Sequence, residues 1–161
     1  MSLTPGSRLP EANLLTMGEN GVESVALSDR LRGRKVILFA LPGAFTGTCS
    51  TAHIPSFIRT ADQLRAKGVD ELICLSVNDP FTMKAWADAT GAAKAGITHL
   101  ADADASFSMS LGVTFTNPKT GLINRSSRYA LILDDGVITH AAVEKPGECG
   151  ISTGEALLEL L

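Results

Sequence analysis

Two short apolar runs constrain the fold more than any other feature of the chain. Residues 35–40 (Lys-Val-Ile-Leu-Phe-Ala) and residues 71–77 (Glu-Leu-Ile-Cys-Leu-Ser-Val) each have the length and character of a buried strand. A helical stripe of apolar side chains lies between them, over residues 50–67, and Pro55 within it predicts a bend. A second helix is expected to begin at Pro80, after the second run. Strand, helix and strand in this order predict a parallel strand pair joined by a helix.

The rest of the chain predicts further strands around this unit. Four of them form two hairpins around glycine-containing turns: residues 13–16, 22–27, 128–133 and 137–143. Residues 98–101 predict one more short strand, and a Ser-Thr-Gly-Glu capping box at 152–155 predicts a terminal helix. We therefore expect an α/β fold, with a mixed central sheet flanked by helices on both faces. No linker or repeat interrupts the sequence, so residues 1–161 are expected to form a single domain.

A cysteine stands where the first apolar run gives way to the helical stripe. The loop after residue 40 reads Leu-Pro-Gly-Ala-Phe-Thr-Gly-Thr-Cys and ends at Cys49. The first N–H groups of a helix have no partner within the helix, and they carry the positive end of its dipole. Such a position lowers the pKa of a thiol from about 8.5 to between about 3.5 and 7.5. The hydroxyl of Thr46 can lie over the same turn, and Pro42 can wall the pocket without donating a hydrogen bond.

Composition excludes several classes of protein. The 161 residues are 45% hydrophobic and carry a net charge of −3, so neither nucleic acid nor an anionic membrane is an expected partner. No apolar run approaches the roughly 20 residues of a membrane-spanning helix, and no signal peptide is evident. The three cysteines, Cys49, Cys74 and Cys149, are odd in number and widely spaced, which is not a disulfide framework. They fit a reducing compartment, and we expect the cytoplasm.

The pattern Pro42-x-x-x-Thr46-x-x-Cys49 resembles the active-site motif of the peroxiredoxins, which are peroxidases with a thioredoxin-like fold. Residues 76–81 (Ser-Val-Asn-Asp-Pro-Phe), followed by Lys-Ala-Trp at 84–86, resemble the type II branch, also called the fifth-type or atypical branch. The resemblance implies that Cys49 is the peroxidatic cysteine and that Pro42 and Thr46 shield and position the peroxide. It also implies that an arginine entering a later strand, Arg128, completes the site.

The resemblance also implies an activity and its partners. A thiolate at Cys49 would reduce hydrogen peroxide and organic hydroperoxides and become a sulfenic acid. No metal, haem, flavin or other cofactor is needed. Glutathione with glutaredoxin, or another external thiol such as thioredoxin, is expected to restore the cysteine. Small members of the family usually pair as homodimers, and Phe45 and Phe81 are candidates for that contact.

Several residues admit more than one interpretation. Cys149 and Cys74 are both possible resolving cysteines. Cys149, however, is displaced from the position where some related chains keep a resolving cysteine, and Cys74 suits core packing. His53 lies one helical turn after Cys49 and could suggest zinc, but a structural zinc site needs four ligands, so we expect His53 to be a polar packing residue beside the pocket. Arg125 is less suited than Arg128 because it does not adjoin the strand. The alternative function is a non-catalytic binding protein or holdase that keeps only the fold.

Overall fold

The first apolar run forms a strand in the interior of a seven-stranded mixed sheet. This strand, β3 (Lys35–Ala40), pairs in parallel with β4 (Glu71–Ser76) and antiparallel with β8 (Tyr129–Asp134). The strand order is β2-β1-β5-β4-β3-β8-β9. The computed structural model describes all residues from 1 to 161. A buried central strand follows from a run in which five consecutive side chains are apolar.

The other elements have short connections. The remaining strands are β1 (Asn13–Gly18), β2 (Gly21–Ala26), β5 (Thr98–Ala101), β6 (Thr114–Asn117), β7 (Leu122–Ser126) and β9 (Val137–Val143). The helices are α1 (Leu27–Leu31), the π-helical turn η1 (Cys49–His53), α2 (Ile54–Ala66), α3 (Pro80–Thr90), α4 (Ser106–Ser110) and α5 (Gly154–Leu158). None of these helices is long and apolar enough to cross a membrane.

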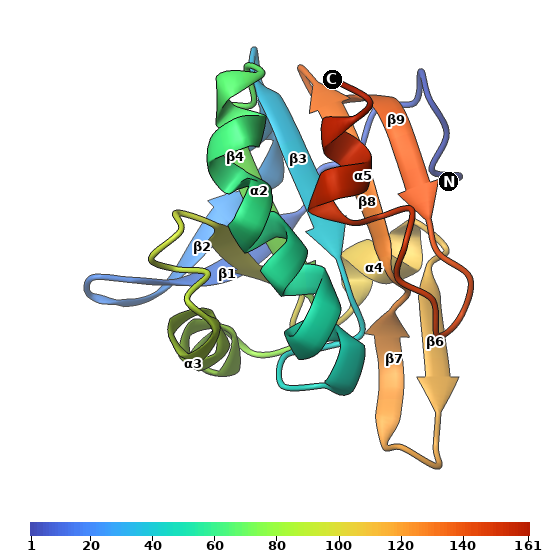
Figure 1. Ribbon diagram of the computed structural model, residues 1–161. Helices are drawn as coiled ribbons and strands as arrows, with labels where there is room; N and C mark the ends of the chain where they lie inside the picture. Colours follow the sequence, from blue (N-terminus) through green and yellow to red (C-terminus); the bar gives the residue numbers. More distant parts are fainter.

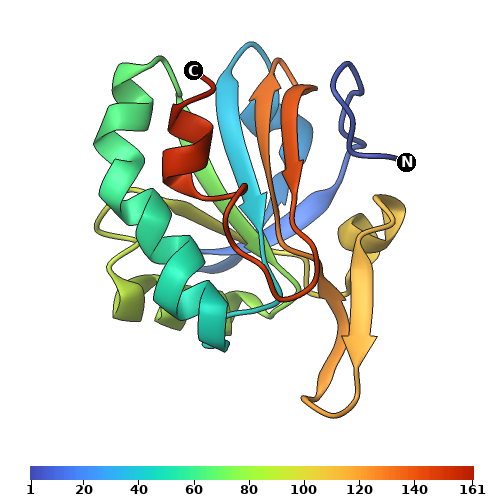
Figure 2. The same cartoon turned by 45° about the vertical axis from the view of Figure 1, so that its right-hand side comes forward.

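Helices cover both faces of the sheet. Helices α2, α3 and α5 contribute Phe57, Trp86 and Leu157 to the core on one face, and α2 and α5 lie side by side there (Figure 1). On the other face, α1 and α4 contribute Leu27 and Phe107 to a second core. The ribbon of β6 and β7 projects away from the sheet in both views (Figures 1 and 2). The predicted α/β fold with a covered mixed sheet is confirmed.

The structure corrects two details of the prediction. The helix expected over residues 50–67 begins instead as the π-helical turn η1 and continues as α2, with Pro55 in the first turn of α2. Pro55 follows η1 directly and has no N–H, so it cannot continue the series of helical bonds to which the Ile54–Cys49 bond belongs. The β6–β7 ribbon was not predicted, since its strands carry no clear alternation of apolar and polar side chains.

Candidate active site

Cys49 begins η1 at the carboxyl end of β3, as the sequence predicts. The residue is 1% exposed. The turn is π-helical because the N–H of Ile54 donates to the carbonyl oxygen of Cys49. The N–H of Cys49 itself donates to no protein acceptor. The sulfur thus lies at the start of a helical segment, beside unpaired N–H groups that favour a negative charge.

Arg128 reaches the sulfur from the neighbouring strand. It directly precedes β8, whose Tyr129 pairs with Ala40 at the end of β3. Nη2 of Arg128 donates to Sγ of Cys49 at 3.2 Å. Arg128 is 9% exposed, and no carboxylate oxygen lies within ion-pair distance of it. A buried cation without a carboxylate partner can stabilise negative charge that develops beside it.

The loop between β3 and η1 is held at three points. Nη1 of Arg125 donates to the carbonyl oxygen of Pro42 at 3.1 Å, and Oδ1 of Asn78 accepts the N–H of Ala44 at 3.0 Å. The hydroxyl of Thr46 donates to a backbone carbonyl within the loop at 2.7 Å. The oxygen of Thr46 therefore remains free to accept a hydrogen bond. The sequence analysis preferred Arg128 to Arg125 as the arginine of the site. The geometry agrees, because Arg125 holds the loop and does not contact the sulfur.

His53 has a contact that the sequence did not predict. It is fully buried, as a packing residue would be, and its ring lies against Phe39 and Phe57, with centroids 5.3 and 5.7 Å away. Its Nδ1, however, lies 2.9 Å from Nη1 of Arg128. Burial, with the charge of Arg128 second, lowers the pKa of His53 to about 3. The one-turn spacing from Cys49 was the sequence signal that placed His53 near the site. Its partner, Arg128, lies far away in the chain and could not be inferred from that spacing.

The two other cysteines lie in contrasting places. Cys74 pairs with Phe39 across β3 and β4 and is fully buried, and this burial raises the pKa of its thiol. Cys149 lies half-buried between β9 and α5, where burial raises the pKa of its thiol and the charge of Arg128 opposes that rise. All three cysteines are free. Of the three thiols, only that of Cys49 accepts a hydrogen bond from Arg128, so the geometry points to Cys49.

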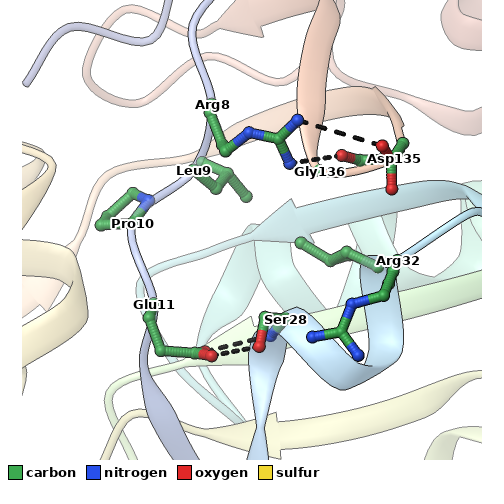
Figure 3. A pocket seen from close by; sticks show the side chains of 9 residues that line it. Arg8, Leu9, Pro10, Glu11, Ser28, Arg32, Asp135 and Gly136 are labelled. Carbon is green, nitrogen blue, oxygen red and sulfur yellow. Dashed lines mark hydrogen bonds and ion pairs between the residues drawn. The ribbon is translucent and has the colours of Figure 1, made fainter.

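A cavity adjoins this site, and a larger one lies elsewhere. The first has a volume of about 210 Å³ and is lined by Pro42, Phe115, Arg128 and the start of the segment after β9. The second, of about 480 Å³, lies at the opposite end of β3, where Arg8 contacts Asp135 and Glu11 contacts Ser28 (Figure 3). The smaller cavity is lined by Arg128, whose Nη2 contacts Sγ of Cys49. We therefore place the chemistry at the smaller one.

The site supplies a nucleophile and a cation. No group of three or more His, Cys, Asp and Glu side chains is arranged to hold a metal ion. A thiolate beside a guanidinium can attack an electrophilic oxygen and stabilise the charge that develops on the departing atom. The oxygen of Thr46, which can still accept, gives a third contact for a small substrate.

Known proteins resemble the chain over nearly its whole length. Residues 4–158 match the Redoxin family. Peroxiredoxin-2D of Arabidopsis thaliana is 41% identical over 160 residues, which cover 99% of this chain and 98% of that protein. Peroxiredoxin-2C of Oryza sativa subsp. japonica is 42% identical over 157 residues, covering 97% and 96%. The crystal structure of reduced Prx3 in complex with hydrogen peroxide from Vibrio vulnificus is 44% identical, covers 98% of each chain and has a TM-score of 0.92.

Proposed function

This chain belongs to the peroxiredoxins, in their type II branch, and from that premise we propose that Cys49 is its peroxidatic residue. The protein is a thiol-dependent peroxidase, with a peroxide as oxidant and a thiol as reductant. The observation that carries the assignment is the 3.2 Å contact between Nη2 of Arg128 and Sγ of Cys49. The related Prx3 was crystallised with hydrogen peroxide, which supports a peroxide as the ligand of this site.

The reaction follows from these groups. The Cys49 thiolate attacks one peroxide oxygen in line with the O–O bond, so that an S–O bond forms and the O–O bond breaks. The departing oxygen takes the proton of the attacked oxygen and leaves as water or an alcohol. Cys49 is left as a sulfenate, which takes up a proton from solvent to become the sulfenic acid. The guanidinium of Arg128 and the Cys49 N–H stabilise the developing negative charge. Thr46 accepts the O–H of the bound peroxide, and Pro42 helps to exclude water.

Loss of one sulfur atom tests this assignment. We expect the wild-type protein to consume hydrogen peroxide with a thiol reductant, and we expect Cys49→Ser to lose that activity. The variants Cys74→Ser and Cys149→Ser serve as matched controls that should still form the sulfenic acid. Undiminished consumption by Cys49→Ser would refute the assignment, and an inactive wild-type protein would favour the alternative of a binding protein or holdase.

We propose that an external thiol restores the oxidised enzyme. Glutathione with glutaredoxin ranks first, because neither other cysteine is well placed for a disulfide. A bond to Cys149, which would make thioredoxin the expected reductant, ranks second, because a surface segment moves at lower cost than a core strand. A bond to Cys74 ranks third, because Cys74 is held in the ladder of β4. A reducing compartment such as the cytoplasm would supply these thiols.

Disulfide mapping tests the ranking. The enzyme is treated with one equivalent of hydrogen peroxide and then glutathione, free thiols are blocked, and peptides are analysed by mass spectrometry. We expect a glutathionylated Cys49 with Cys74 and Cys149 free. A Cys49–Cys149 link in high yield would reverse the ranking.

We also propose a homodimer that forms beside the active-site loop. Phe45 and Phe81 are 58% and 63% exposed. The segments that carry them are joined by the hydrogen bond between Ala44 and Asn78. Two exposed aromatic side chains on neighbouring segments suit an interface with a second copy. Sedimentation at micromolar concentration should show a dimer, and Phe45→Ser/Phe81→Ser should shift it to monomer. A wild-type protein that sediments only as monomer contradicts this proposal.

A further inference from the structure

His53 makes two hydrogen bonds that fix the chemical form of its ring. Its Nδ1 lies 2.9 Å from Nη1 of Arg128, and its Nε2 lies 3.0 Å from the carbonyl oxygen of Ser152. A guanidinium can only donate and a carbonyl oxygen can only accept. Nδ1 must therefore carry the lone pair, and Nε2 must carry the proton. The lowered pKa of His53, about 3, keeps the ring in this neutral form near neutral pH.

This ring is a side-chain acceptor that holds the guanidinium of Arg128. One terminal nitrogen of Arg128, Nη2, donates to Cys49, and the other, Nη1, donates to His53. No carboxylate pairs with Arg128. Because a guanidinium is planar, fixing Nη1 also fixes the direction of Nη2. Without Nδ1 as an acceptor, the long arginine side chain would have other orientations available.

The segment behind His53 is itself held by one carboxylate oxygen. Oε2 of Glu144 accepts the N–H of Gly150 at 2.6 Å, the N–H of Ser152 at 2.9 Å and the hydroxyl of Ser152 at 2.7 Å. The N–H of Glu144 donates to the carbonyl oxygen of Arg128 at 3.0 Å. The contacts therefore form a closed ring: Arg128, Glu144, Ser152, His53 and back to Arg128. The segment so held also carries Cys149.

We propose that His53 is a positioning residue that aims the guanidinium of Arg128 at Cys49, and that the segment between β9 and α5 sets this aim through Ser152 and Glu144. The inference rests on the proposed role of Arg128 in the peroxidase reaction. It has a consequence for catalysis, because any movement of this segment withdraws the carbonyl oxygen that holds His53. Oxidation of Cys49 is then fast only while the carbonyl oxygen of Ser152 accepts the hydrogen bond from His53.

Two other roles for His53 conflict with its contacts. A general base would need a free lone pair, but Nδ1 already faces a guanidinium. A metal ligand would face the same cation, and no further ligands gather around it. Simple packing against Phe39 and Phe57 remains as the competing explanation. The experiment must therefore separate an oriented hydrogen bond from a filled space.

Two amide substitutions at His53 test its contacts with Arg128 and with Ser152 separately. In His53→Asn, the side-chain oxygen can occupy the place of Nδ1 and still accept from Arg128. In His53→Gln, the side-chain nitrogen can occupy the place of Nε2 and still donate to Ser152, while the acceptor for Arg128 is lost. The oxidation rate is followed by stopped-flow fluorescence of Trp86, the one tryptophan, whose Nε1 donates to Ser50 beside Cys49 at 2.9 Å.

We expect His53→Gln to lower kcat/KM for hydrogen peroxide by about 100-fold, the scale of a small misplacement of a catalytic group. His53→Asn should keep most of that rate, and the thiol-dependent reduction step should change in neither. Equal losses in both variants would assign His53 to packing, and a greater loss in His53→Asn would overturn the proposal. His99→Gln is the matched control, since His99 is also a buried histidine but lies outside the site. Because its ring lies 5.7 Å from that of Trp86, this variant is compared by peroxide consumption instead of fluorescence.

Substitutions at Glu144 test the segment itself, even if a variant at His53 folds poorly. All three donors converge on one oxygen, so Glu144→Gln can keep that acceptor whereas Glu144→Leu removes it. We expect Glu144→Leu to slow oxidation far more than Glu144→Gln. Combining Glu144→Leu with His53→Gln should add little to the loss from His53→Gln alone. Additive losses, or equal rates for the two Glu144 variants, would overturn the coupling. A wild-type protein that does not oxidise at Cys49 would instead refute the proposed function.

Discussion

The two ends of β3 use arginine in opposite ways. At the amino end, Arg34 donates to Glu71 at 2.8 Å, Arg30 lies 3.4 Å from the same carboxylate, and Thr98 donates to it at 2.6 Å. At the carboxyl end, Arg128 contacts only a thiol and a neutral imidazole among side chains. At the first end, one carboxylate opposes the charge of the arginines and ties the starts of neighbouring strands together. The second end keeps its charge uncancelled.

The difference indicates where a cation can take part in chemistry. A guanidinium paired with a carboxylate has little attraction left for a further anion, since the partner already opposes its charge. Neutral acceptors, by contrast, fix the geometry of a guanidinium and leave its charge in place. His53 does this for Arg128, and the carbonyl oxygen of Pro42 does it for Arg125.

Removing one arginine at each end should give the largest contrast. Arg128→Met keeps most of the side-chain length but removes the charge, and we expect kcat/KM for peroxide to fall by about 10²–10³ with little loss of stability. Arg34→Met should keep the activity per folded molecule but lower the free energy of unfolding by about 1–3 kcal/mol, since Glu71 loses a partner. Steady-state kinetics and urea unfolding measure the two effects. A large loss of activity in Arg34→Met would erase the distinction.

Acid should act on the carboxyl end through His53. The unfolded chain protonates this residue near its ordinary pKa of about 6.5, whereas burial and Arg128 lower the pKa to about 3 in the folded protein. Between these two pH values, unfolding takes up a proton. The free energy of unfolding should therefore decrease by about 1.4 kcal/mol for each unit by which the pH is lowered. His99, with a pKa lowered by burial to about 4, should add a similar slope over a narrower window. Urea titrations from pH 7 to pH 5 measure the sum.

The variant His53→Asn supplies the control for this pH dependence. It should remove about half of the slope above pH 5, because only His99 then still takes up a proton on unfolding. An unchanged slope would mean that His53 is already protonated beside Arg128 in the folded protein.

A methyl group in the active-site loop should have a smaller effect. A Cβ at position 43 would collide with the guanidinium of Arg125, whereas a Cβ at position 47 of the same loop meets nothing within 4 Å. We expect Gly43→Ala to displace Arg125 from Pro42 and to slow oxidation by about tenfold, the factor for 1.4 kcal/mol. Gly47→Ala should change the rate little. Stopped-flow fluorescence compares them, and equal rates would show that Arg125 does not hold the loop.

The smallest effect is expected at the surface of the amino end. Arg8 and Asp135 lie 4.0 Å apart with side chains more than half exposed, and such pairs contribute about 1 kcal/mol or less. Arg8→Ala should therefore leave peroxide consumption unchanged and shift urea unfolding only slightly. A loss as large as that of Arg34→Met would show that exposure does not separate the arginines at this end.

Local patterns predicted the sheet and the chemical groups of the site. The Asp-Asp-Gly turn defined the hairpin of β8 and β9, and the two apolar runs defined β3 and β4. The reactive cysteine at the end of β3 follows from the strand–loop–helix order alone. Arg128 came only from the resemblance to a family, because its contact with Cys49 joins residues far apart in the chain.

The details that were wrong or missed depend on tertiary contacts. The hydroxyl of Ser152 was expected to cap α5, but it donates to Glu144, and Thr153 caps the helix instead. A serine hydroxyl has several acceptors within reach, and the sequence does not show which one the fold brings near. The orientation of His53 has the same origin, since both of its partners are distant in the chain.

Because η1 is π-helical, the direction of the Cys49 side chain depends on the number of residues between Cys49 and Ile54. Its bond from Ile54 back to Cys49 encloses one residue more than an α-helical turn does. Deleting one residue between them would let the segment close as an ordinary α-helix. Because each α-helical residue turns the chain by about 100°, the sulfur would then face away from Arg128. Such a deletion is therefore expected to abolish the peroxidase activity, although Cys49, Thr46 and Arg128 remain in the sequence.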